Sequence, residues 1–207
     1  MTTRLDLIDL DQPLPGQREF ISCWLARRDG LAFIVDPGPR STAPLLVARL
    51  RELGVTRLDY ILLTHIHLDH AGGTAQVAAA FPGARVVCHQ NGAQHLVEPQ
   101  RLWEGSCAVL GVAAQVYGEP VPVAADAFAP ADALARAGIA VIPTPGHAPH
   151  HLCYLYDGTL FVGEAAGTTH PLPGGVRYLR PATPPRFFLE VALESLDKLL
   201  ADRKSVV

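Results

Sequence analysis

Thr64-His65-Ile66-His67-Leu68-Asp69-His70-Ala71-Gly72-Gly73 is the stretch that decides the fold of this chain and the place of its chemistry. It holds three imidazoles and one carboxylate within six residues, directly after the apolar residues 58–63, which are typical of a buried strand. With 9 His among 207 residues, three His at fixed positions arise by chance at only about one starting point in twelve thousand. The run therefore indicates a functional site.

The spacing of the run explains how its side chains can converge. In an extended segment the side chains at i and i+2 point the same way, so His65 and His67 can bind one ion. Asp69 and His70 then lie where the chain turns into a helix, and they face a neighbouring point. Imidazole and carboxylate suit zinc, iron, manganese or nickel, and the absence of thiolate argues against a closed structural zinc site. The alternative is a set of surface or helix-capping histidines.

This run resembles the His-x-His-x-Asp-His signature of the metallo-β-lactamase superfamily. Two later segments fit the same pattern: Thr144-Pro145-Gly146-His147 is similar to the next ligand motif, and Leu160-Phe161-Val162-Gly163-Glu164 to the strand with the metal-bridging carboxylate. The resemblance covers roughly residues 5–200. It implies an α/β fold, an αββα sandwich of two mixed β-sheets flanked by helices. The motifs are informative about the fold and the metal centre but say little about the substrate.

The resemblance implies a binuclear centre with two divalent ions, zinc first and iron, manganese or nickel as alternatives. One metal would be held by His65, His67 and His147, and the second by Asp69 and His70, with Glu164 between them. Asp69 is also the candidate catalytic carboxylate. The implied activity is that of a metal-dependent hydrolase, in which a metal-bound hydroxide attacks an ester, thioester, lactone, amide or phosphodiester bond of a small-molecule substrate.

Three alternatives stay open. Glu164 stands where most members carry Asp, and one extra methylene adds roughly 1.5 Å of reach, so this residue either fits a retracted strand or only caps the loop. An iron-dependent redox enzyme of the same fold, acting on persulfides or oxygen, is the second alternative, because His and carboxylate ligands also accept iron. An inactive truncated fragment is the third.

Composition narrows the class of protein. The chain has 207 residues, which suits one domain, and we expect that domain to span residues 1–201. A net charge of −3, without a basic cluster beyond Arg27-Arg28, argues against a nucleic-acid partner. No apolar run approaches a membrane span and no signal peptide is evident, so the predicted location is cytoplasmic. The widely spaced cysteines are expected to be small buried hydrophobes; they are Cys23, Cys88, Cys107 and Cys153.

Hydrophobic periodicity predicts most of the regular elements. Strands are expected at residues 5–10, 20–26, 31–36, 58–64, 85–89, 139–142, 152–156 and 159–162, and helices at residues 42–54, 70–80 and 186–201. Residues 99–130 are hard to interpret, and residues 166–185 are expected to form a loop. Asp36 is expected either as a plain turn residue or as a residue that orients a metal ligand.

The C-terminus is expected to be truncated. In the superfamily a further His follows the last helix on one more strand, whereas here the sequence stops soon after Ala201. Residues 202–207 match, residue for residue, one translated frame of a common short-read sequencing adapter. We therefore expect a non-native tail, a missing last strand and an incomplete second metal site.

Overall fold

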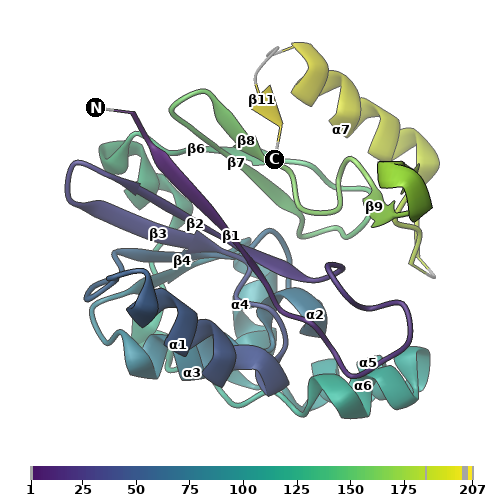
Figure 1. The fold of residues 1–207 in the computed structure, drawn as a ribbon, viewed down its shortest axis with the longest axis horizontal. Helices are drawn as coiled ribbons and strands as arrows, with labels where there is room; N and C mark the ends of the chain where they lie inside the picture. Colours follow the sequence, from purple (N-terminus) through teal and green to yellow (C-terminus); the bar gives the residue numbers. More distant parts are fainter. Residues whose placement is uncertain (1, 185, 202–204, 207) are drawn as a thin grey trace. The chain divides into compact units, whose positions relative to one another are not determined.

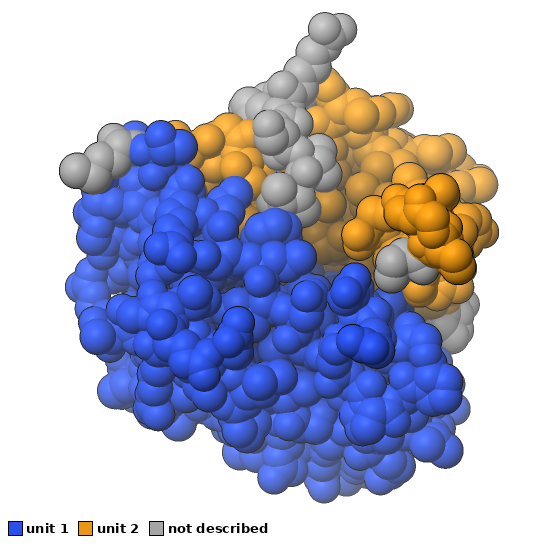
Figure 2. All heavy atoms as spheres, in the orientation of Figure 1, with its two compact units in different colours: residues 1–130 blue, residues 131–207 orange. Residues whose placement is uncertain are grey.

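A computed structural model describes residues 2–184, 186–201 and 205–206. The chain forms two compact units, residues 1–130 and residues 131–207 (Figure 2). Most of the predicted tail, residues 202–204 and 207, lies outside the described residues. Within the described ranges, no helix is long and apolar enough to cross a lipid bilayer.

The first unit is built on a five-stranded mixed sheet in the order β1-β2-β3-β4-β5. Its strands are β1 (Arg4–Asp9), β2 (Ser22–Arg28), β3 (Leu31–Val35), β4 (Tyr60–Leu62) and β5 (Arg85–Val87). Strands β1, β2 and β3 pair antiparallel, whereas β3, β4 and β5 pair parallel. Because the carboxyl ends of parallel strands meet at one edge, the residues after β3 and the residues after β4 lie next to each other.

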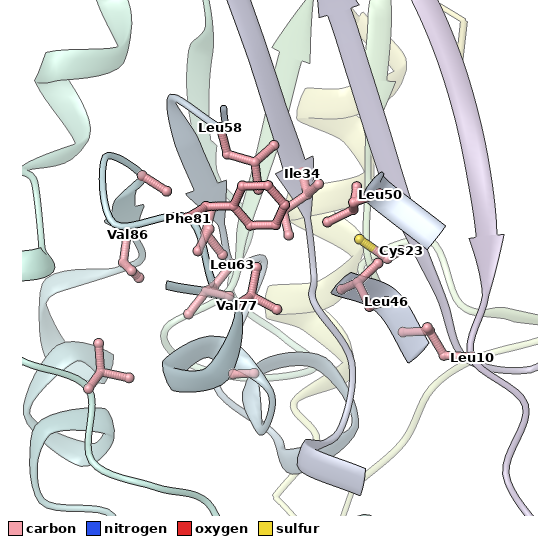
Figure 3. Packing of buried hydrophobic residues seen from close by; sticks show 14 of the residues in the cluster. Leu10, Cys23, Ile34, Leu46, Leu50, Leu58, Leu63, Val77, Phe81 and Val86 are labelled. Atoms are coloured by element: carbon pink, nitrogen blue, oxygen red, sulfur yellow. The ribbon is translucent and has the colours of Figure 1, made fainter. Parts of the chain in front are cut away.

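Helices α1 (Ala43–Glu52) and α3 (Thr74–Ala80) lie side by side against this sheet (Figure 1). Leu46 and Leu50 of α1 belong to the same buried cluster as Ile34 and Leu63 (Figure 3). Burying side chains of this size contributes about 1.5–3 kcal/mol each. The spacing of the leucines predicted this helix, but Leu45, which belongs to the same apolar set, is exposed.

The helix predicted at residues 70–80 is in fact two helices, α2 (Leu68–Ala71) and α3. The interruption lies at Gly72 and Gly73, where the chain packs against other backbone atoms. A Cβ on Gly72 would lie 2.6 Å from the carbonyl oxygen of Leu68, and the N–H of Gly73 donates to Gly38 O at 2.8 Å. Gly72 therefore allows a close approach that a side chain would prevent, and at Gly73 a Cβ would be tight, at 3.2 Å from Gly38 O.

Residues 99–130, which the sequence left open, begin with two helices. After β5 the chain forms α4 (Gln90–Val97), α5 (Gln100–Leu110), α6 (Val112–Tyr117) and a short 3₁₀ turn (Ala125–Ala127). Gly111 separates α5 from α6 with a positive φ of 56°. The following segment runs back along the sheet, where Ala129 N donates to Val86 O at 2.9 Å.

The second unit contains a four-stranded sheet in the order β11-β8-β7-β6. Its strands are β6 (Ala140–Pro143), β7 (Leu152–Tyr156), β8 (Thr159–Phe161) and β11 (Ser205–Val206). The pairs β6–β7 and β7–β8 are antiparallel and β11–β8 is parallel, so this sheet is mixed as well. A 3₁₀ helix (Ala131–Ala137) precedes β6, and α7 (Leu189–Ala201) packs through Leu199 against Cys153 and Leu160.

The prediction of a loop at residues 166–185 is partly wrong. Residues 168–180 hold two paired strands, β9 (Thr168–Pro171) and β10 (Arg177–Arg180), with a 3₁₀ turn (Pro173–Gly175) between them. The β-branched Thr168 and Thr169 favour a strand, and Gly174 and Gly175 supply the positive φ values of the turn. The many prolines and glycines in this segment favoured the prediction of a loop over that of a short hairpin.

Candidate metal centre

The first unit brings the imidazoles of the histidine run together. The chain stays extended from the end of β4 to His67, which is the N-cap of α2 with φ −60° and ψ 152°. The ring centroids of His65 and His67 are 4.5 Å apart, and those of His65 and His70 are 4.1 Å apart. The i, i+2 spacing thus brings His65 and His67 together as expected, and His70, expected at a neighbouring point, lies just as close to His65.

Asp36 orients the histidine cluster through hydrogen bonds to Thr64, the residue before His65. Its carboxylate accepts the backbone N–H of Thr64 at 2.7 Å and the Thr64 hydroxyl at 2.6 Å. Because the only hydroxyl proton of Thr64 goes to Asp36, the Thr64 oxygen accepts from Nδ1 of His65, 3.0 Å away. His65 therefore carries its proton on Nδ1, and Nε2 keeps the lone pair that a metal ion needs.

The same carboxylate fixes His70. Nδ1 of His70 lies 2.9 Å from Oδ2 of Asp36, which can only accept, so this ring also carries its proton on Nδ1. Its Nε2 faces Asp69, with 3.7 Å to Oδ2. Asp36 has a positive φ of 55°, which is uncommon for a residue with a side chain. The two expectations for Asp36 are thus both met, because the turn residue is also the one that orients two candidate ligands.

The second unit contributes His147 and Glu164. Nδ1 of His147 donates to the carbonyl oxygen of Ala182 at 3.1 Å, so in the neutral ring Nε2 carries the lone pair. This Nε2 lies 2.9 Å from Oε2 of Glu164, which follows β8 in a turn. A nitrogen lone pair and a carboxylate oxygen at this distance require a proton or a cation near both of them. The longer side chain of Glu164 therefore does reach a candidate ligand.

Helix α7 supports the turn that carries His147. Ser195 donates its hydroxyl to the carbonyl oxygen of Pro145 at 2.6 Å. Gly146 has a φ of 141°, and a Cβ at this position would lie 2.6 Å from Cα of Ala192. Only glycine permits this approach, so the Pro145–Gly146 turn is fitted to the surface of α7. Sequence patterns could not predict this support, because α7 follows some 45 residues later along the chain.

Several other histidines lie outside the predicted ligand set. His151 is buried, and its Nδ1 lies 2.8 Å from the hydroxyl oxygen of Thr144. His89 is the N-cap of α4 and accepts the N–H of Asn91. His95 lies within α4, and His170 pairs with Tyr178 in the β9–β10 hairpin.

The donor atoms in each unit fit a divalent ion. The ligand atoms of His65 and His67 lie within 4.8 Å of each other, as do those of His147 and Glu164. Two ligand atoms on one tetrahedral zinc ion are about 3.4 Å apart, so small side-chain movements would complete either pair. Each of His65, His70 and His147 donates its other ring nitrogen to a partner, the arrangement that metal-ligating histidines almost always show. The residues therefore suit zinc, iron or manganese more than magnesium or calcium.

Two curated relatives show which proteins this chain is similar to. Hydroxyacylglutathione hydrolase from Xanthomonas campestris pv. campestris (strain B100) is 33% identical over 169 residues, which are 79% of this chain and 51% of that protein. The metallo-beta-lactamase fold-containing protein ST1585 from Sulfurisphaera tokodaii is 31% identical over 161 residues, 73% of this chain and 59% of that protein. This chain thus spans between one half and three fifths of the length of these relatives.

A solved structure and a family model agree with these relatives. The crystal structure of ST1585 from Sulfolobus tokodaii matches with a TM-score of 0.78 at 26% identity, over 97% of this chain and 76% of that one. The model of the metallo-beta-lactamase superfamily matches residues 16–207. The chain therefore belongs to the metallo-β-lactamase superfamily and has its α/β fold.

Proposed function

We propose that this protein is a metal-dependent hydrolase. In this proposal His65, His67, His147 and Glu164 hold one divalent ion, and Asp69 and His70 are ligands of a second. The observation that carries the proposal is the orientation of the rings. Nδ1 of His65, His70 and His147 each lies beside a defined oxygen partner, so in the neutral ring Nε2 is the nitrogen that can bind a metal.

The side chains have separate tasks in this proposal. A bound divalent ion lowers the pKa of a coordinated water and polarises a substrate carbonyl. Asp69 has a largely buried carboxylate beside His70, and it can accept a proton from the attacking water. Asp36 and Thr64 hold the rings still, which reduces the reorganisation that metal binding would otherwise cost.

Thioesters are the first substrate class to test. The relatives named hydroxyacylglutathione hydrolase support this choice. Esters, lactones, amides and phosphodiesters are the other members of the panel, because the fold hosts many chemistries.

The test combines metal analysis with hydrolysis. The purified full chain is expected to retain zinc, iron or manganese by elemental analysis and to hydrolyse an acyl-glutathione thioester, with activity lost on chelation and restored by the metal. Replacing His67 by Ala should remove at least one ion per chain and lower the rate by 10²-fold or more, since one ligand fewer weakens the whole centre.

His95→Ala is the matched control, because this histidine belongs to α4 and not to the cluster. It should keep both the metal content and the rate of the unchanged chain. Undiminished metal in His67→Ala would disprove the ligand assignment. Full metal occupancy without turnover on any hydrolase substrate, together with oxygen consumption, would instead favour the iron redox enzyme.

A further inference from the structure

A second polar site lies at the other end of the first unit's sheet. A hollow of about 460 Å³ opens there, lined by the start of β1, the β2–β3 turn and the loop between α1 and β4. Its volume is in the range of pockets that hold small ligands. Four arginines contribute to its lining, Arg4, Arg27, Arg28 and Arg57, and we call it the arginine hollow.

The fold creates this cluster from separate segments. Arg4 and Arg27 are paired across β1 and β2, and Arg28 is paired with Leu31 across the β2–β3 hairpin. Arg57 arrives from the loop before β4. The sequence shows only Arg27 and Arg28 as neighbours, so the register of three strands is needed to see the other two.

The hollow is basic although the chain is not. Its lining includes four arginines and one acidic residue, Asp29, whereas the whole chain has 17 Lys and Arg against 20 Asp and Glu. Two further carboxylates contact the cluster: Asp6 accepts from Arg4 and Arg27, and Asp59 pairs with Arg57 at 3.1 Å. Four guanidiniums against three carboxylates still leave one net positive charge, because arginine stays protonated.

The carboxylates hold the guanidiniums in place, and those of Arg4 and Arg57 stay largely exposed while Arg27 is mostly buried. Arg27 is fixed by Asp6 at 2.8 Å and by the carbonyl oxygen of Leu53 at 2.7 Å. Arg57 uses Nη2 for its contacts with Gly30 O and Asp59, and its side chain is 66% exposed. The exposed pairs of Arg4 and Arg57 add little stability, so a ligand can compete for these two guanidiniums at little cost.

We propose that the arginine hollow binds a small molecule that carries two or more phosphate groups. Several fixed guanidiniums match the many oxygens of such a ligand and can engage them in bidentate pairs. A nucleic acid usually binds along an extended basic surface. The net charge of this chain is −3, and its sequence has no basic cluster beyond Arg27-Arg28, so a small ligand fits the hollow better.

This site is separate from the metal centre. Strand β3 starts at the hollow with Leu31 and ends at Val35, next to Asp36. Five residues of strand span roughly 15 Å, so a ligand in the hollow does not touch the histidine cluster. Ligand binding in the hollow can therefore be tested separately from the hydrolase activity.

Titration with pyrophosphate tests the proposal. The full chain is stripped of metal with a chelator, the chelator is removed, and binding is followed by NMR and calorimetry. We expect saturable binding with a Kd below about 1 mM and chemical-shift changes at Gly30, Gly54 and Arg57. Arg57→Gln and Arg28→Gln should each weaken binding at least fivefold. Arg57→Lys should weaken it less than Arg57→Gln, because lysine keeps the positive charge but loses the planar guanidinium that makes bidentate hydrogen bonds.

Arg101→Gln is the matched control, an exposed arginine on α5 outside the hollow. It should leave the Kd unchanged. Equal weakening by Arg101→Gln, no saturation, or shifts confined to residues 64–73 would overturn the proposal. Co-sedimentation with phosphatidylglycerol vesicles and titration with a short RNA complete the test, and a stronger, Arg57-dependent response to either would refute a small-molecule ligand.

Discussion

Asp36 accepts both the backbone N–H and the hydroxyl of Thr64, at 2.7 and 2.6 Å, and so ties the end of β3 to the residue before the first histidine. The position of a candidate ligand is thereby set by a carboxylate that does not belong to the histidine run. Parallel pairing of β3 with β4 brings the two segments together.

Asp36→Asn should weaken metal binding although it keeps the shape of the side chain. The amide would present N–H groups where the carboxylate accepts, so Nδ1 of His70 would have to become the acceptor and Nε2 would carry the proton. Loss of such a supporting partner typically costs 10–100-fold in metal affinity. Competitive titration with a chromophoric chelator measures it.

Asp59→Asn is the control for that variant, since Asp59 also accepts a backbone N–H, that of Ala32 at 2.9 Å, but at the other end of the sheet. It should leave metal affinity unchanged. Equal affinities for Asp36→Asn and the unchanged chain would show that the carboxylate serves the turn alone.

Glu164→Asp should lower metal affinity even though it restores the residue that most members of the superfamily carry. The existing side chain already places Oε2 2.9 Å from Nε2 of His147, and removing a methylene withdraws the carboxylate by roughly 1.5 Å. We expect an affinity loss of about tenfold, measured by the same titration. Tighter binding by the Asp variant would mean that Glu164 is not fitted to the site.

The cysteines should differ in reactivity. Burial raises the pKa of the Cys88 thiol to about 12, and burial, together with the nearby Asp36 charge, raises the pKa of Cys23 well above its usual range. Cys107 is only partly buried, which corrects the expectation that all four cysteines are core residues. Iodoacetamide at pH 8 should therefore label Cys107 first, and mass spectrometry should find Cys23 and Cys88 labelled only after unfolding. Early labelling of Cys88 in the folded chain would contradict this assignment.

Asp6 should make stability depend on pH in the acid range. Burial alone would raise its pKa, but hydrogen bonds from Arg27 and Arg4 lower the pKa below 3.8. The stabilisation is therefore present above the unfolded pKa and is lost as the pH falls through the folded pKa. Urea unfolding at pH 7 should find Asp6→Asn less stable by about 1 kcal/mol. The difference should shrink as the pH falls below 3.8, and a difference that did not change with pH would exclude a charge effect.

Local patterns predicted the strands and the motifs well. Strand β4 and the histidines after it follow from an apolar run and an i, i+2 spacing, which depend only on neighbouring residues. The single helix predicted at residues 70–80 was wrong, because the break at Gly72 comes from backbone packed against backbone. Such contacts join segments that the sequence separates.

Long-range partners account for what the sequence did not predict. The carbonyl of Ala182 and the hydroxyl of Ser195 support the His147 turn, yet neither belongs to a ligand motif. The arginine hollow depends on strand register, since a shift of one residue would turn Arg4 to the other face of the sheet. Positions that acquire a role only through tertiary contacts carry no local signal.

The contact between Gly146 and Ala192 limits how this protein can be recombined with its relatives. A loop transplanted with any side chain at position 146 would collide with the backbone and the methyl group of Ala192 on α7. In a chimera, the turn before His147 and helix α7 therefore have to come from the same parent protein. A crossover between them would combine a turn and a helix whose surfaces do not fit.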